Sequence, residues 1–111
     1  MQHDTRRFIP KTDFVTTPGY LTGPGAREEA GLPKGTGPAF VVSTLAVMDF
    51  DSESKRMRLK ATHPGVSVED VKKNTGFELV IPATIPITEP PTEEQLGILR
   101  NRIDVQGALR R

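Results

Sequence analysis

The fold is decided by residues 39–61, which read AFVVSTLAVMDFDSESKRMRLKA. Residues 39–50 are apolar except at three positions, which is the pattern of a strand buried on both faces. Residues 51–54 are turn formers, and residues 56–61 alternate strictly between polar and apolar side chains. We therefore expect residues 39–50 to form one buried strand that pairs, as an antiparallel hairpin, with a half-buried strand at 56–61.

Two motifs of the capping-box type predict helices after the hairpin. Residues 67–70, Ser-Val-Glu-Asp, frame the start of a helix over residues 68–75, and Gly76 is well suited to end it. Residues 92–95, Thr-Glu-Glu-Gln, frame the start of a second helix that runs to about residue 104. Both helices are short.

Glycine and proline divide the rest of the chain into loops. Ten of them crowd into residues 18–38, which predicts tight turns around a short helix at 26–30. Residues 77–81 alternate briefly and indicate a return strand, and four prolines then mark residues 82–91 as an extended connector. The expected fold class is α/β, in one domain over residues 1–111. Its parts are residues 1–38, loop-rich with a short helix, residues 39–81, with strands and a helix, and residues 82–111, with a Pro-rich connector and a C-terminal helix.

The composition excludes several classes of protein. Fifteen basic and fourteen acidic residues among 111 give a net charge of +1, without the basic excess of nucleic-acid-binding proteins. The absence of cysteine excludes disulfides, a thiolate nucleophile and cysteine-bound metals. No apolar run reaches the roughly 20 residues that cross a bilayer. The first residues lack the apolar stretch of a signal peptide, so we expect a cytoplasmic protein with no nucleic-acid or membrane partner.

Neither histidine stands in a pattern that indicates chemistry. His3 lies beside Asp4 near the terminus, where exposure to solvent is the favoured interpretation, and His63 precedes Pro64, where a structural or turn role is favoured. The spacings of histidine metal ligands are absent, so we expect no metal site. No nucleophile elbow of the GxSxG type occurs, so the pattern of a serine hydrolase is absent as well.

Two other motifs have both a functional and a structural interpretation. Residues 23–25, Gly-Pro-Gly, resemble a phosphate-cradling loop, but the proline removes a donor, and a tight entry into the helix at 26–30 is preferred. Arg56, Arg58 and Lys60 form a row of cations suited to the phosphates of an adenine nucleotide or coenzyme A. Such a row is more often a solvated face that protects a sheet edge. From the residues alone, no catalytic residue, no metal ligand and no cofactor-binding residue is assigned.

Several segments taken together resemble one family. They are TPGYLTGPG at 17–25, GPAFVVSTLAV at 37–47, HPGVSVEDV at 63–71, TGF at 75–77 and PPTEE at 90–94. The chain is similar to the C-terminal half of the β subunit of a family I coenzyme A transferase. Within that family it most resembles the glutaconate CoA-transferase branch, which includes ring-opening acyl-CoA hydrolases of steroid breakdown.

The resemblance implies a fold, a reaction and partners. The fold would be the C-terminal part of an open CoA-transferase-like (NagB/RpiA-like) α/β sheet domain, whose strands complete a sheet begun upstream. The reaction would move coenzyme A between carboxylic acids such as glutaconate or 3-oxoacids, with a coenzyme A thioester as substrate and no covalently bound cofactor. The partners would be the missing N-terminal half of the β subunit, together with a CoA-transferase α subunit.

Two departures from the family pattern qualify this expectation. The family has Thr-Asp-Leu in the central strand, whereas Thr44 stands here in place of the acid. Family β subunits are also much longer than this chain, and where the family uses a catalytic glutamate, it belongs to a motif in the absent N-terminal half. No glutamate of this chain stands in that motif, so none is assigned the role; the glutamates are Glu28, Glu29, Glu53, Glu69, Glu78, Glu89, Glu93 and Glu94.

We therefore expect a truncated or split subunit that is inactive by itself. The alternatives are a non-catalytic assembly or binding module that docks a CoA-transferase-like partner, and a subunit of a ring-opening acyl-CoA hydrolase.

Overall fold

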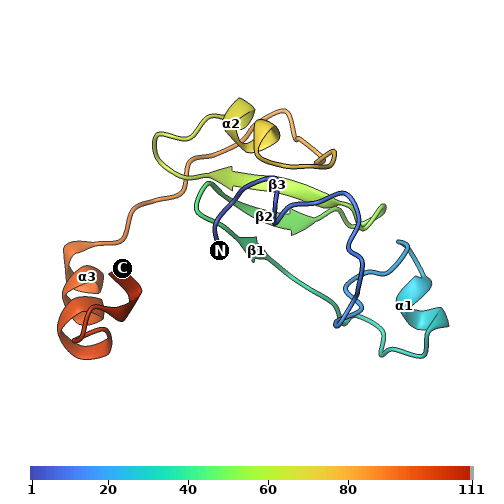
Figure 1. Cartoon of the computed structure of the whole chain (residues 1–111), viewed down its shortest axis with the longest axis horizontal. Coiled ribbons are helices and arrows are strands. Elements are labelled where there is room, and N and C mark those ends of the chain that lie inside the picture. Colours follow the sequence, from blue (N-terminus) through green and yellow to red (C-terminus); the bar gives the residue numbers. More distant parts are fainter. Residues whose placement is uncertain (111) are drawn as a thin grey trace.

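The computed structural model describes residues 1–110 and centres on a three-stranded antiparallel sheet (Figure 1). The strands are β1 (Val41–Val42), β2 (Ala46–Phe50) and β3 (Met57–Thr62), in the spatial order β1-β2-β3. The predicted hairpin between β2 and β3 is confirmed, with Met48 opposite Leu59 and Phe50 opposite Met57. The mixture of a sheet with short helices is the expected α/β class.

The expectation of one continuous strand over residues 39–50 is wrong. The chain reverses between β1 and β2, so that Val42 lies opposite Val47. The hydroxyl of Ser43 closes this turn, because its Oγ accepts hydrogen bonds from the backbone N–H groups of Leu45 and Ala46 at 3.3 and 3.1 Å. A serine that bonds to its own backbone in this way turns the chain without glycine or proline.

The core lies on one face of the sheet. Met48, Leu59 and Val71 are completely buried there, and Val71 comes from helix α2 (Val68–Lys73). Phe8 of the N-terminal segment and Leu79 complete the buried cluster. Segments that precede and follow the hairpin in the sequence therefore cover the same face of it, and side chains of this kind supply most of the free energy of folding.

Helix α2 begins as the sequence predicts and ends earlier. Ser67 is its N-cap, and Ser67 and Asp70 bond to each other's backbone N–H groups, so the capping box is confirmed. The helix ends at Lys73, with Asn74 as its C-cap, so the predicted role of Gly76 as the ending residue is wrong. Gly76 instead donates its N–H to the carbonyl oxygen of Phe8 at 2.7 Å, and a Cβ at Gly76 would lie 2.5 Å from that oxygen.

The predicted return strand at 77–81 is reduced to a single bridge. Val80 lies parallel to β3, donating to the Met57 carbonyl at 3.0 Å and accepting from Leu59 at 2.9 Å. A second parallel bridge joins Thr62 to Ile87 further along the connector. Proline has no N–H to donate, which is why a segment so rich in proline makes only isolated bridges along β3.

The glycine- and proline-rich region forms a loop lobe, residues 17–38, beside the β2–β3 turn (Figure 1). It contains the short helix α1 (Ala26–Glu29), which starts after Gly25 and is followed by Gly31, and both glycines have a φ of 79°. The predicted helix at 26–30 and the preferred interpretation of Gly-Pro-Gly as its entry are thus confirmed. Arg27 ties the lobe together by donating to the Gly19 carbonyl and to Thr36.

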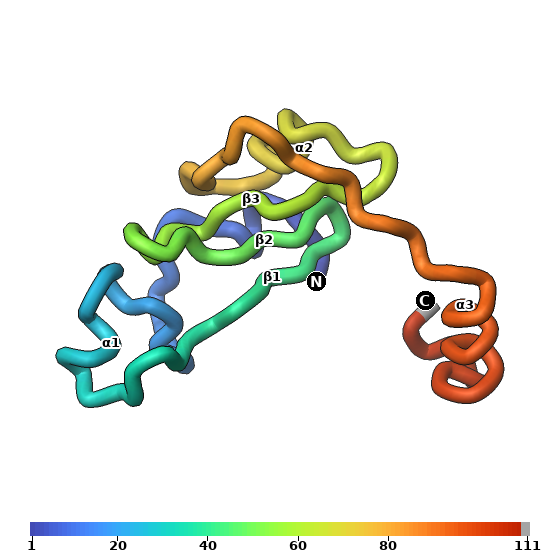
Figure 2. The backbone as a smooth tube through the Cα atoms, turned by 180° about the vertical axis from the view of Figure 1, so that it is seen from behind, coloured from blue at the N-terminus to red at the C-terminus, as the bar shows by residue number. Residues whose placement is uncertain are grey.

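The C-terminal arm, residues 92–110, stands away from the sheet (Figures 1 and 2). It consists of α3 (Glu93–Ile98), a π-helical turn η1 (Leu99–Ile103) and a 3-10 turn η2 (Ala108–Arg110). The capping box of Thr92 and Gln95 is confirmed. The radius of gyration is 16.5 Å, against about 13 Å for a compact chain of this length. No helix within residues 1–110 is long and apolar enough to cross a membrane.

Candidate functional site

A buried polar cluster holds the N-terminal segment on the sheet. His3 is only 4% exposed, so the expectation that it faces solvent is wrong. Its Nδ1 lies 2.8 Å from Ser43 Oγ and its Nε2 lies 2.9 Å from Thr75 Oγ1. These partners are 40 and 72 residues away in the sequence, so no local pattern could have found the cluster.

The hydrogen-bond partners favour one tautomer of a neutral His3. The Thr75 hydroxyl donates to the Val71 carbonyl at 2.7 Å, so it accepts from the imidazole, and Nε2 carries the proton. In the neutral ring Nδ1 is an acceptor, so it receives the Ser43 hydroxyl proton, whose other acceptor within reach is the Ala46 carbonyl oxygen at 3.1 Å. Burial lowers the pKa of His3 below its ordinary value, and the nearby negative charge of Asp4 partly opposes this effect. The cluster is thus arranged for a neutral imidazole.

His63 has the structural surroundings that the sequence favours. Its Nδ1 lies 2.8 Å from Thr88 Oγ1, and its Nε2 lies 2.9 Å from the Ser43 carbonyl oxygen. It therefore ties the connector to the β1–β2 turn. Within residues 1–110, no three histidine, aspartate or glutamate side chains converge on a position that could hold a metal ion.

The row of cations on β3 is partly neutralised. Arg58 makes two hydrogen bonds of 2.8 Å to the carboxylate of Asp49, which lies opposite it on β2. Lys60 Nζ lies 3.7 Å from the same carboxylate, and Arg56 pairs with the exposed Glu78. Hydrogen bonding to Arg58 lowers the pKa of Asp49, although its burial acts in the opposite direction. Because Arg58 is held by Asp49, the row supports the structural interpretation better than a phosphate site.

The side chains of Asp49, Arg58 and Lys60, here called the Asp49 cluster, lie on the face of the sheet opposite the core, because they alternate along β2 and β3 with the buried Met48 and Leu59. In Figure 2, which views the molecule from the side opposite to Figure 1, no other segment crosses in front of the three strands. Phe40 and Val42 are 59% and 58% exposed there, and Lys60 Nζ lies 5.6 Å from the centre of the Phe40 ring. This open face combines apolar side chains with an ion cluster that has one more positive than negative charge. Exposed apolar groups beside such a cluster are typical of a surface that another protein body covers.

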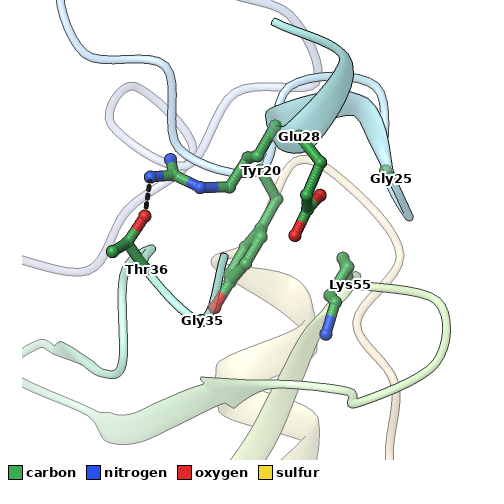
Figure 3. Close-up of a pocket in the computed structure, with 8 residues that line it drawn as sticks. Tyr20, Gly25, Glu28, Gly35, Thr36 and Lys55 are labelled. Atoms are coloured by element: carbon green, nitrogen blue, oxygen red, sulfur yellow. Dashed lines mark hydrogen bonds between the residues drawn. The ribbon is translucent and has the colours of Figure 1, made fainter. Parts of the chain in front are cut away.

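Two adjoining cavities lie where the loop lobe meets the hairpin turn. The smaller, of about 150 Å³, is lined by Tyr20, Arg27, Glu28, Thr36 and Lys55 together with three glycines. In Figure 3, Glu28 and Lys55 lie to the same side of the Tyr20 ring. The larger cavity, of about 480 Å³, shares Tyr20 and Lys55 and has an apolar wall that includes Met57 and Phe77.

Most polar groups around the smaller cavity bond within the lobe or within the β2–β3 turn. The Tyr20 hydroxyl donates to the Pro38 carbonyl at 3.0 Å, and Lys55 Nζ donates to the Ser52 carbonyl at 2.8 Å. The Nε atom of Arg27 is buried and has no hydrogen-bond partner within the described part of the chain. That atom is closed to solvent, so Glu28 is the lining side chain whose polar group is most open to a ligand.

All eight glutamates of the chain are exposed on the surface. None lies in either cavity except Glu28 and Glu78 at the rims. A carboxylate that attacks a thioester needs a site that excludes water and stabilises the developing charge. None of these positions provides such surroundings within residues 1–110.

The comparisons with known sequences agree on one family. The sequence model of coenzyme A transferase matches residues 1–74. The B (β) subunit of glutaconate CoA-transferase from Acidaminococcus fermentans is 44% identical over 104 residues, which cover 94% of this chain and 39% of that protein. The cholesterol ring-cleaving hydrolase IpdB subunit of Rhodococcus jostii is 32% identical over 108 residues, which cover 93% of this chain and 40% of that protein.

Solved structures give the same result. The crystal structure of glutaconate coenzyme A-transferase from A. fermentans matches 97% of this chain and 41% of that chain, with a TM-score of 0.89 and 44% identity. R. jostii IpdAB matches 96% of this chain and 42% of that chain, with a TM-score of 0.75 and 30% identity. The chain therefore spans about two fifths of the length of the curated relatives it matches. On the family match, the identity to curated relatives and the shared fold, this chain belongs to the coenzyme A transferase family.

Proposed function

We propose that this chain is the C-terminal part of the β subunit of a CoA-transferase that moves coenzyme A between carboxylic acids. The observation that carries the proposal is the 44% identity to the β subunit of glutaconate CoA-transferase, joined to a TM-score of 0.89 against that enzyme. In this proposal the chain works with the remaining part of a β subunit, and both work with an α subunit. The reaction is placed in the cytoplasm, and a coenzyme A thioester is the substrate rather than a resident cofactor.

The proposal assigns the catalytic carboxylate to a part of the assembly outside this chain. In the mechanism that the family resemblance implies, a glutamate attacks the thioester to give an anhydride, and then carries coenzyme A as a glutamyl thioester. The exposure of all eight glutamates favours a structural role for this chain within the enzyme. Its contribution would be the buried hairpin and the open sheet face against which the catalytic part is positioned.

Hydrolysis of a ring-containing acyl-CoA is the second candidate reaction. It rests on the likeness to the IpdB subunit of R. jostii, at 32% identity, and to IpdAB, with a TM-score of 0.75. Both values are lower than those for the glutaconate enzyme, so transfer is preferred. A non-catalytic assembly module is the third candidate, favoured by the absence of a buried glutamate within residues 1–110.

Co-expression tests these candidates directly. The chain is produced with the α subunit of the A. fermentans enzyme and with the part of the β subunit that this chain does not match. Transfer of coenzyme A from acetyl-CoA to glutaconate supports the proposal. Release of free coenzyme A without transfer, when the steroid-ring thioester is offered, favours the hydrolase. A stable complex that does neither favours the assembly module, and a matched complex with the native A. fermentans segment is the positive control.

A further inference from the structure

The backbone forms an arch, and β1 lies on its concave side. In both views the C-terminal arm and the loop lobe extend to the same side of the sheet, which is the side of β1 (Figures 1 and 2). The first residue lies on that side as well, because the Met1 carbonyl accepts a hydrogen bond from Thr44 at the β1–β2 turn at 2.9 Å. Within residues 1–110, β1 pairs with β2 alone, so its outer edge offers unpaired backbone groups.

The arm exposes apolar side chains although it is folded back on itself. Ile103, Val105 and Leu109 are each about two-thirds or more exposed. Asp104 is 6% exposed, and both of its carboxylate oxygens accept from the Leu109 N–H, which folds the arm back on itself. Because the arm is already folded and has apolar side chains on its surface, it loses little conformational entropy when it binds another protein.

The position of the arm is shared with a solved enzyme. The match to the glutaconate CoA-transferase crystal structure covers 97% of this chain at a TM-score of 0.89, so it includes the arm in its extended position. An arm that swung freely or folded onto its own sheet would fall outside such a superposition. The extended position is therefore the one that suits an assembled enzyme.

We propose that β1 and the C-terminal arm form one docking surface, and that its occupant is the part of a β subunit that this chain does not match. This inference rests on the proposed function. About three fifths of the matched subunit has no counterpart in this chain. In the family resemblance that part is the N-terminal one, so it adjoins Met1, and Met1 lies on the same side of the sheet as the proposed surface. Arg100 and Arg102 on the arm are exposed, and Lys60 lies beside Phe40, so the occupant presents an apolar patch with carboxylates at its rim.

The test measures affinity for separately produced partners. The probes are the unmatched part of the A. fermentans β subunit and, in a second series, the α subunit of the same enzyme. Ile103→Asp in the arm and Val42→Asp on β1 are compared with Ile87→Asp as the matched control. Ile103 and Ile87 have similar exposed fractions, 68% and 63%, but Ile87 lies on the connector beside β3, away from β1.

The expected result is that the arm and β1 variants each weaken binding of the β-subunit probe by about tenfold or more, the size of effect found for central interface positions, while Ile87→Asp leaves it unchanged. If Ile103→Asp weakens only the binding of the α subunit, the arm serves a different partner and the inference is overturned. Self-association of the chain that Ile103→Asp abolishes would overturn it equally, because the occupant would be a second copy. Val42→Thr replaces Val42→Asp if the latter unfolds the sheet.

The two proposals can fail separately. Unchanged affinity of Ile103→Asp in a complex that transfers coenzyme A overturns the docking surface and leaves the function standing. Weakened affinity in a complex without transfer or hydrolysis supports the docking surface and overturns the proposed function.

Discussion

The imidazole ring of His3 lies flat on the phenyl ring of Phe8, with the ring centres 3.8 Å apart and the planes 6° from parallel. Both residues belong to the N-terminal segment, and together they press it against the β1–β2 turn and the end of α2. Since the ring is buried among uncharged partners, a proton added to it brings a charge into the core. The attachment of this segment should therefore depend on pH.

We predict that the chain loses stability as the pH falls below the ordinary pKa of histidine, about 6.5. The pKa of His3 is lowered in the folded state, so its stabilising contribution is complete above the unfolded pKa and is lost as the pH falls toward the folded one. Asp4 is the charged group that faces it, and Asp4 is itself paired with Arg7. Urea unfolding of the wild type and of His3→Asn between pH 8 and about 5 measures the effect. A difference between the two proteins that does not change with pH would contradict the prediction.

A second prediction concerns Gly76, where a side chain has no room. Gly76→Ala places a Cβ 2.5 Å from the Phe8 carbonyl oxygen, so the segments must separate, at a cost of about 2 kcal/mol in the free energy of unfolding. Gly97→Ala in α3 is the control, because nothing lies within 4 Å of a Cβ there. Denaturant unfolding compares the two variants. Equal effects would show that the contact with Phe8 has no energetic weight.

The third prediction contrasts the two capping boxes. Ser67→Ala should lower the free energy of unfolding by about 1 kcal/mol, the usual effect of losing an N-cap oxygen, because α2 carries the buried Val71. Thr92→Ala removes the same interaction from α3, which has no buried residue. It should leave the main unfolding transition in place and accelerate hydrogen exchange in the arm alone. A shift of the main transition by Thr92→Ala would mean that the arm unfolds together with the sheet.

The fourth prediction concerns Arg58, whose two hydrogen bonds satisfy the nearly buried carboxylate of Asp49. Arg58→Met leaves that carboxylate with Lys60 alone, so it should destabilise the chain and raise the pKa of Asp49. Arg56→Met removes a pair with the exposed Glu78 and should have little effect. Titration of the carboxylates by NMR measures the pKa. An unchanged pKa of Asp49 in Arg58→Met would show that the pairing does not control it.

The fifth prediction is that the chain alone binds a hydrophobic dye and has no CoA-transferase activity. Phe40 and Val42 are exposed on the open face of the sheet, so the chain alone leaves apolar area uncovered. The fluorescence of the dye at micromolar protein concentration measures the exposed apolar area, and the Val42→Thr variant serves for comparison. A chain that binds no dye and stays monomeric would show that the domain is complete by itself.

Local patterns predicted the elements that depend on neighbouring residues. Alternation at 56–61 predicted β3, and the spacing of Ser67 and Asp70 predicted the start of α2, because both signals lie within one element. The turn at Ser43 was missed because a side-chain hydroxyl, rather than glycine or proline, reverses the chain there. Apolar residues on both sides of the turn therefore look like one strand.

Contacts between distant segments could not be predicted in this way. Gly76 has the residue type of a helix end, but its position is set by Phe8, far away in the sequence. His3 looks like a surface residue because Ser43 and Thr75 become its neighbours only after folding. The helix of the arm was predicted from its capping box. The separation of the arm from the sheet was not predicted, because it depends on contacts that the proline-rich connector does not make.

The placement of Tyr20 has an optical consequence. The chain has one tyrosine and no tryptophan. The ring lies 5.0 Å from the ring of Phe50, while Lys55 Nζ lies 5.6 Å from its centre, at the joint of the loop lobe with the sheet. All tyrosine emission from this polypeptide therefore originates at one joint. A partner that contains tryptophan would quench it through energy transfer on docking, so assembly could be followed in real time without an attached label.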